Sequence, residues 1–283
     1  PINRLDMAAG TFIHLFAGGP ATIVVGDLSG AGVYASSIGD ITTGAIDSTL
    51  DVDLQSFNGS ISTLGIAAAT DVTLDAAGNV ATGNITAGGL IDVTGASLTL
   101  GNLNANSIDL TTTVADLTVG DVTIPGNLAL TTAGDLTFGN LSAFDVDVAA
   151  TGSIVGGNIG SATDITALAG LDLSLGDLLA GGAVSATADG LAVGDVSGNF
   201  LTLTSNVGDV STGDLNAFGS LNINAAADFL FGSITAQLVD LNIPGSIIGG
   251  FIDSGTDITA VAGTDIDVGN LTAGGFDGEV FQL

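Results

Sequence analysis

One glycine position recurs every 18 to 20 residues along most of this 283-residue chain. Thirteen of its fourteen copies are Gly, and the exception is Leu64. The reference positions are Gly26, Gly44, Leu64, Gly83, Gly101, Gly120, Gly139, Gly157, Gly176, Gly194, Gly213, Gly232, Gly250 and Gly269. A register held over so many copies indicates stacked structural repeats, in which each unit buries its apolar side against its neighbours.

Three other columns keep a fixed distance from the reference position. Three residues before it stands an apolar residue in every copy, from Ile23 to Ile266. Two residues after it stands an aliphatic residue in every copy, from Leu28 to Leu271. Four residues after it the residue is small except at Ile124, which indicates an inward position close to a corner.

Each repeat contains three short runs in which apolar and polar residues alternate. In residues 134–151 the apolar members are Leu136 and Phe138, then Leu141 and Ala143, then Val146 and Val148. Turn-forming and small residues separate the runs, and a period of two is typical of β-strands with one apolar face. The repeat therefore predicts three short strands joined by bends.

A period near 19 leaves two candidate architectures, the leucine-rich repeat and the parallel β-helix. The first needs a helical segment in each repeat, whereas Thr, Val, Ile, Asp and Gly dominate here. We therefore expect an all-β fold, a parallel β-helix of about 14 coils. Residues 23–283 would form this single β-solenoid, and residues 1–22 would form an irregular N-terminal segment that caps the first coil or docks onto a neighbour.

The chain is strongly acidic, with 30 Asp and Glu against a single Lys or Arg, which is Arg4. A net charge near −29 argues against nucleic acids and anionic membrane surfaces as partners. It favours solubility, repulsion between side faces and cation binding. The absence of Cys excludes disulfides and Cys-ligated metals, and no stretch is apolar for long enough to predict a transmembrane helix.

The ends predict continuation of the stack. Residues 274–283 carry no polar cap, and the terminal coil of a solenoid exposes unpaired strand edges. We expect another coil to follow, either from a second copy stacked head to tail or from further coils of the same long chain. Since Pro1 is not an initiator Met, we expect a processed form or a segment of something longer.

The corner after the reference position is occupied by Asn or Asp in ten of fourteen coils. These side chains suit a corner because they bond local backbone groups and tolerate left-handed conformations, and amides in stacked coils can form ladders. A sharper alternative concerns Asp177, Asp195 and Asp214, which would lie above one another. Three stacked carboxylates repel, and a bound Ca²⁺ would relieve that repulsion.

An enzyme is not expected, although parallel β-helices include polysaccharide lyases and hydrolases. Lyase chemistry needs a base, and the only Arg lies outside the array. His14 has no identifiable catalytic partner, and Tyr34 is the only Tyr in a chain without Trp. Carboxylate pairs at glycosidase spacing arise by chance among thirty acids. We predict neither catalytic residues nor a cofactor.

The motifs in residues 83–112 and 134–152 resemble the filamentous-haemagglutinin-like β-helical repeats of large bacterial exoproteins. The resemblance covers about 90 per cent of the chain and rests on the repeat pattern. It implies a right-handed parallel β-helix, exported to the cell surface, that acts as an adhesin or a structural fibre.

The expected function is therefore mechanical. We expect an extracellular, stiff rod that forms part of a surface filament, matrix fibre or adhesin stalk, with heterologous head-to-tail contacts between copies. A carbohydrate-binding or carbohydrate-active β-helix is the alternative. A groove with converging carboxylates would favour that alternative, and smooth sides would favour the structural role.

Overall fold

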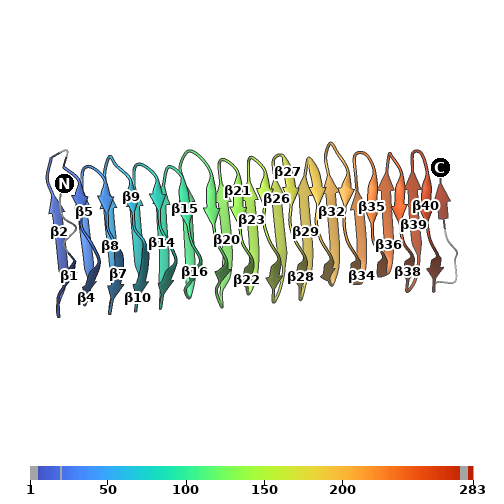
Figure 1. Ribbon diagram of the computed structural model, residues 1–283. Coiled ribbons are helices and arrows are strands. Elements are labelled where there is room, and N and C mark those ends of the chain that lie inside the picture. The colour runs from blue at the N-terminus through green and yellow to red at the C-terminus, as the bar shows by residue number, and fades with distance from the viewer. Residues whose placement is uncertain (1–5, 20, 275–279, 283) are drawn as a thin grey trace. The chain divides into compact units, whose positions relative to one another are not determined.

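The computed structural model describes residues 6–19, 21–274 and 280–282. This part of the chain contains β-strands and no helix, which confirms the all-β prediction. The chain divides into two compact units, residues 1–143 and 144–283, here called unit 1 and unit 2. Each is a parallel β-solenoid, and together they contain about 14 coils (Figure 1).

Unit 1 consists of three ladders of short strands. The first strand of each coil belongs to β3 (Ile23–Val24), β6 (Ile41–Thr42), β9 (Ile61–Ser62), β12 (Val80–Ala81), β15 (Leu98–Leu100), β18 (Leu117–Val119) and β21 (Leu136–Phe138). The second ladder contains β1 (Met7–Ala8), β4 (Leu28–Gly30), β7 (Ala45–Ser48), β10 (Gly65–Ala68), β13 (Ile85–Ala87), β16 (Leu103–Asn104), β19 (Val122–Thr123) and β22 (Leu141–Ala143). The third contains β2 (Ile13–Ala17), β5 (Val33–Ser37), β8 (Val52–Ser56), β11 (Val72–Ala76), β14 (Leu90–Gly95), β17 (Ser107–Thr112) and β20 (Asn127–Thr132).

Unit 2 repeats the same plan. Its first ladder contains β24 (Ile154–Val155), β27 (Asp172–Ser174), β30 (Gly190–Ala192), β33 (Val210–Ser211), β35 (Phe229–Phe231), β37 (Ile247–Gly249) and β40 (Ile266–Val268). The second contains β25 (Ile159–Ser161), β28 (Leu178–Ala180), β31 (Val196–Gly198), β38 (Ile252–Ser254) and β41 (Leu271–Ala273), and the third β23 (Asp145–Ala150), β26 (Ile165–Ala169), β29 (Ala183–Ala188), β32 (Phe200–Ser205), β39 (Ile258–Ala262) and β42 (Val280–Gln282). Second and third strands are fused in β34 (Leu215–Asn224) and β36 (Ile234–Ile243).

Within each unit, the described pairings are parallel and join equivalent strands of successive coils. In unit 1 Ile66 pairs with Ile85, and Ile85 pairs with Leu103. In unit 2 Leu173 pairs with Leu191, and Leu191 with Val210. Because each backbone bonds to the coils before and after it, like residues stack on like residues, and the apolar columns become continuous.

The core occupies the inside of the coils, where the sequence columns place it. Ile41, Ile85, Leu136, Leu178 and Ile234 are each at most 2 % exposed. The small column four residues after the reference glycine is also buried, including the larger Ile124. The last coil differs, because Ile266, Val268 and Leu271 are only half-buried. Burial of aliphatic columns is the main contribution to the stability of such a fold.

Length variation between coils is absorbed between the second and third strands. The repeat length varies by about one residue from coil to coil, and in the sequence this variation falls between the second and third strands. In unit 2 the register between β34 and β36 shifts between Ala217 and Ser220, while the columns on either side stay aligned. A bulge therefore takes up the extra residue without moving the core.

The segment before residue 23 contains regular strands. Within residues 1–22, which the sequence pattern sets apart as irregular, Met7–Ala8 and Ile13–Ala17 form β1 and β2. They pair with β4 and β5 in the register of the later coils. The role of this segment as a cap or docking element remains a prediction, and Arg4 lies outside the described residues. No helix in the described part of the chain meets the length and hydropathy needed to cross a membrane.

Candidate functional site

The Asn and Asp side chains at the first corner bond to the backbone of the following coil. The N–H of Asp195 donates to Oδ1 of Asp177 at 2.9 Å, and the N–H of Asp214 donates to Oδ1 of Asp195 at 2.8 Å. Oδ1 of Asp214 accepts both the N–H and the hydroxyl of Ser233, each at 2.8 Å. A ladder of corner side chains therefore exists, but its principal donors are backbone N–H groups: where amide-to-amide bonds were expected, the N–H of Asn102 donates to Oδ1 of Asn84 at 3.0 Å.

Glycine at the reference position makes room for this bond. A Cβ on Gly213 would lie less than 3.0 Å from Oδ1 of Asp195, closer than real Cβ contacts allow. The same collision with an Asn or Asp oxygen would occur at Gly26, Gly44, Gly101, Gly120, Gly139, Gly176, Gly194 and Gly232. These glycines are needed for close approach and not for a left-handed backbone, since Gly19 is the only described residue with positive φ.

Leu64 is the one reference position without glycine, and no corner side-chain oxygen approaches it. The preceding coil carries Ala45 at the corner, which has no side-chain oxygen to pass over the reference position. Leu64 is accordingly tolerated there, with 66 % of its side chain exposed. A corner oxygen is one reason for glycine at the reference position and not the only one, because an added Cβ on Gly83 or Gly250 would instead meet backbone atoms of the preceding coil.

Aspartates at the other corners form equivalent bonds. Oδ1 of Asp71 accepts the N–H of Leu90 at 2.7 Å, and Oδ1 of Asp164 accepts the N–H of Ala183 at 2.7 Å. At least thirteen Asp side chains accept such a bond from the next coil: Asp6, Asp27, Asp40, Asp71, Asp116, Asp121, Asp145, Asp164, Asp177, Asp195, Asp209, Asp214 and Asp228. Much of the negative charge therefore caps backbone groups at corners.

The structure brings the three predicted calcium ligands into one stack. Asp177, Asp195 and Asp214 occupy equivalent corners of successive coils, as expected. Each presents one oxygen to a backbone N–H, which leaves one outward oxygen per coil. In the described residues no group of three or more His, Cys, Asp or Glu side chains is placed to hold a metal ion. Calcium binding at this stack stays a prediction.

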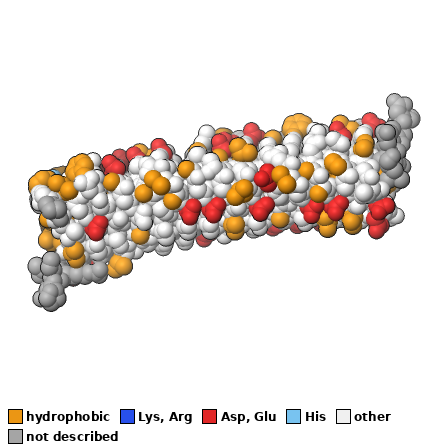
Figure 2. All heavy atoms as spheres, turned by 90° about the horizontal axis from the view of Figure 1, so that it is seen from above, with side chains coloured by type: hydrophobic (Ala, Val, Ile, Leu, Met, Phe, Trp, Pro, Cys, Tyr) orange, Lys and Arg blue, Asp and Glu red, His pale blue; other side chains and the backbone are white. Residues whose placement is uncertain are grey.

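The outward face of the third ladder in unit 1 carries a second acidic group. Asp53, Asp75, Asp92 and Asp109 project from β8, β11, β14 and β17, and we call them the acidic face. Asp92 pairs directly with Asp109 in the register of the strands. Figure 2 shows acidic side chains on the visible surface of both units, without a Lys or Arg among them.

Two carboxyls of the acidic face have raised pKa values. Burial is the main cause of the raised pKa of Asp53, and the neighbouring charges of Asp75 and Asp51 add to it. Burial likewise raises the pKa of Asp92, with further contributions from Asp109 and Asp75. Burial and the charges of neighbouring carboxylates therefore both disfavour ionisation on this face, where the described residues include no Lys or Arg.

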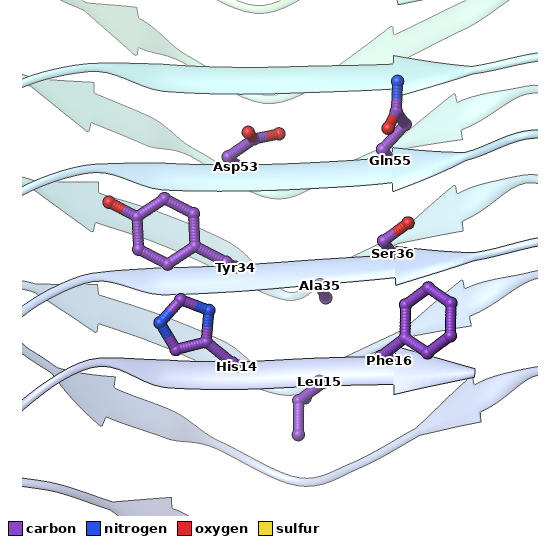
Figure 3. A pocket seen from close by; sticks show the side chains of 8 residues that line it. All are labelled: His14, Leu15, Phe16, Tyr34, Ala35, Ser36, Asp53 and Gln55. Carbon is purple, nitrogen blue, oxygen red and sulfur yellow. The ribbon is translucent and has the colours of Figure 1, made fainter. Parts of the chain in front are cut away.

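A hollow adjoins the acidic face at β2, β5 and β8. Its outward lining forms two columns, with His14, Tyr34 and Asp53 in one and Phe16, Ser36 and Gln55 in the other (Figure 3). The rings of His14 and Tyr34 stack at 5.0 Å with an interplanar angle of 11°. The Tyr34 hydroxyl donates to Oδ2 of Asp51 at 2.9 Å, and this bond is the main cause of the raised pKa of Tyr34.

The hollow offers recognition groups but no catalytic pair. Asp53 is the only carboxylate among the residues that line it. Glycoside hydrolysis needs two carboxyls at a set separation, which the residues that line this hollow do not supply. His14 instead stacks on Tyr34, a contact across one coil that was not predicted, although the 20-residue separation of the two positions in the sequence carried the signal.

Comparison with known proteins finds no matching family model, no matching curated protein and no matching solved structure. The β-solenoid repeat fold is compatible with a β-helical repeat region of the kind that the sequence motifs resemble.

Proposed function

We propose that this chain is an extracellular structural protein, a stiff β-solenoid that forms part of a surface filament, matrix fibre or adhesin stalk. The observation that carries the proposal is the construction of the corners. Side chains there are used to satisfy the backbone of the next coil, as Asp195 does for Asp214, and the reference glycines exist to permit it. Residues used in this way stabilise the stack itself.

The resemblance to filamentous-haemagglutinin-like repeats supports the cell-surface part of the proposal. In that setting a repeat array serves as a spacer or fibre, and its length is set by the number of coils. A solenoid that needs no disulfide is compatible with export, and the net charge near −29 keeps its side faces from associating with one another.

The proposed partners are copies of the chain stacked end to end or further coils of a longer chain. Ile266 and Leu271 of the last coil are half-buried, whereas their counterparts Ile247 and Ile252 are at most 1 % exposed. A following coil would cover these side chains and pair with the backbone of β40 and β41. Head-to-tail stacking is a heterologous contact, and it produces a fibre when the ring does not close.

Light scattering after size exclusion, over a wide range of protein concentration, tests the self-stacking form of this proposal. We expect species that lengthen with concentration and appear as filaments in negative-stain microscopy. Leu271→Asp should abolish lengthening because it places a charge in the contact, whereas the matched Thr272→Asp, at an exposed outward position, should not. A strict monomer at every concentration would contradict head-to-tail stacking.

The carbohydrate alternative can be tested at the hollow of β2, β5 and β8. Its stacked His14 and Tyr34 are the kind of surface on which a sugar ring packs, and the single carboxylate Asp53 favours binding over catalysis. Titration with neutral oligosaccharides, followed by Tyr fluorescence, would detect such binding. Loss of the fluorescence change in His14→Ala, which retains the single Tyr as the fluorophore, would assign it to this site.

A further inference from the structure

Several aromatic side chains lie together on one surface of unit 1. The sequence contains one His and one Tyr, and these two side chains stack on each other. Phe12 packs obliquely against both, with centroid distances of 6.2 Å to His14 and 6.0 Å to Tyr34. Elsewhere along the third ladder of unit 1 the outward positions hold mainly Asp and Thr. The concentration of rings here is therefore a local departure from the repeat.

Phe16 separates two adjoining hollows. On one side lies the hollow with Tyr34 and Asp53, and on the other an apolar one that includes Ile38 and Phe57. Phe16 is 82 % exposed and Phe57 is 53 % exposed. The small Ser36 side chain lies between Phe16 and Gln55 and lines both hollows (Figure 3). Large exposed rings around a hollow are typical of a binding surface.

Carboxylates border the same rings. Asp51 accepts the Tyr34 hydroxyl, Asp53 lines the hollow, and Asp75 accepts Nε2 of Gln55 at 3.4 Å. The crowding of these charges contributes to the raised pKa of Asp53. The only Lys or Arg of the chain is Arg4, so the described residues supply no ammonium or guanidinium group to neutralise them.

We propose that this aromatic–acidic surface, formed by His14, Phe16, Tyr34, Asp53, Gln55 and Phe57, docks a cationic polypeptide segment through its Arg or Lys side chains. A guanidinium or ammonium over an aromatic ring is attracted by the face of the ring, and the neighbouring carboxylates add charge complementarity. The hydrogen bond that the Tyr34 hydroxyl donates to Asp51 increases electron density on the ring that a cation would contact.

Charge selects this occupant over the others. A second copy of the chain carries the same net charge near −29 and would be repelled from an acidic side surface. A neutral glycan can stack on the rings, but it gains nothing from the carboxylates beyond hydrogen bonds. A flexible cationic segment satisfies both the rings and the charges, and the field of the whole chain would accelerate its association.

Fluorescence anisotropy with a short labelled peptide of alternating arginine and serine tests the proposal on the full chain. A matched peptide with glutamine in place of arginine controls for the backbone. Because a strongly acidic protein attracts cations everywhere, local docking must be separated from diffuse attraction by matched variants. Asp53→Asn is compared with Asp240→Asn, and Phe16→Ser with Phe218→Ser, all at exposed outward positions of unit 1 or unit 2.

We expect Asp53→Asn and Phe16→Ser each to weaken binding of the arginine peptide about fivefold or more, and the unit 2 variants to change it less than about twofold. Binding should fall between about 0.02 M and about 0.5 M NaCl, and the glutamine peptide should not bind. Equal losses within each matched pair would reduce the interaction to diffuse attraction and overturn the proposal. So would equal binding of the glutamine peptide, absence of binding, or full competition by a neutral oligosaccharide. None of these outcomes depends on whether copies stack end to end.

Discussion

The third-ladder faces of the two units differ, although the coils beneath them are the same. In unit 1 the outward residues of β8, β14 and β17 are Asp53, Asp92 and Asp109. In unit 2 the equivalent column keeps Asp147 and Asp240, but the four coils between them present the neutral residues Thr166, Ser185, Thr202 and Asn222. The inward residues beside them are buried aliphatics or Ala in both units. Outward positions are thus free to vary, and functional differences between coils have to be sought there.

The largest expected effect tests the part that the units share. Gly120→Ala in unit 1 and Gly213→Ala in unit 2 should each lower the free energy of unfolding by about 2 kcal/mol, because the new Cβ meets an Asn or Asp oxygen. Gly208→Ala is the control, since its Cβ would lie 3.5 Å from the nearest atom. Chemical denaturation followed by circular dichroism measures all three.

Removing the oxygen should relieve the clash. Asp195→Ala alone forfeits one exposed hydrogen bond, worth about 1 kcal/mol. Combined with Gly213→Ala it should cost less than the sum of the two single changes by about 1 kcal/mol or more. Additive losses would show that the corner glycine is required for another reason, and the explanation of Leu64 after Ala45 would fail with it.

The apolar columns were predictable because alternation with period two reports directly which face of a strand is buried. The hydrogen-bond partner of the corner Asn and Asp side chains was not predictable. The stagger between coils decides whether their Oδ1 atom reaches a side-chain amide or a backbone N–H of the next coil. The occurrence of Leu64 at the reference position after a corner Ala45 indicated that corner side chains approach this position in the next coil. Residues 1–22 were set apart because they depart from the repeat and hold the only Arg, His and Met, although Asp6 and Met7 fit the columns.

The aromatic hollow could be predicted only in its components. His14 and Tyr34 are obvious as rare residues, but they meet only if β2 stacks on β5, and the N-terminal segment had been separated from the array. Asp177, Asp195 and Asp214 were placed correctly in one stack because the repeat spacing alone determines it.

A smaller effect tests what distinguishes unit 1. The pKa of Asp53 and of Asp92 is raised above the ordinary value of 3.8 in the folded chain. The folded state therefore binds more protons than the unfolded state just above that value, so stability falls as the pH rises through the raised pKa values. Asp53→Asn and Asp92→Asn should raise the unfolding midpoint at neutral pH and flatten this slope.

Thermal melting between pH 3.5 and pH 7 measures the slope, in which about 1.4 kcal/mol corresponds to one unit of pKa difference. The control is Thr202→Asn, which introduces the same amide at an outward position of unit 2 without changing the charge. It should leave the slope of the parent chain intact. An Asp53→Asn variant that melts at a lower temperature at neutral pH, with an unchanged slope, would show that the carboxylates of unit 1 are not crowded.

The smallest expected effect concerns the corner carboxylates of unit 2. One oxygen of each of Asp177, Asp195 and Asp214 accepts a backbone N–H, which leaves about one further carboxylate oxygen per coil at a spacing of about 4.8 Å. Ca²⁺ takes 6 to about 8 oxygen ligands, so this stack would leave most of its coordination to water. We therefore expect the melting midpoint to be the same in Ca²⁺ and in EDTA, within about 1 °C.

Asp195→Asn is the matched variant, because an amide oxygen can accept the N–H of Asp214 as the carboxylate does, while the charge is removed. The variant should melt at or slightly above the melting temperature of the parent, because it removes the middle one of three like charges. Its melting midpoint should also be unchanged by EDTA. A midpoint that drops in EDTA for the parent, but not for Asp195→Asn, would instead establish calcium binding at this corner. Unit 2 would then differ from unit 1 in its corners as well as its faces, because the corners between Asp27 and Asp121 of unit 1 carry only the neutral residues Ala45, Gly65, Asn84 and Asn102.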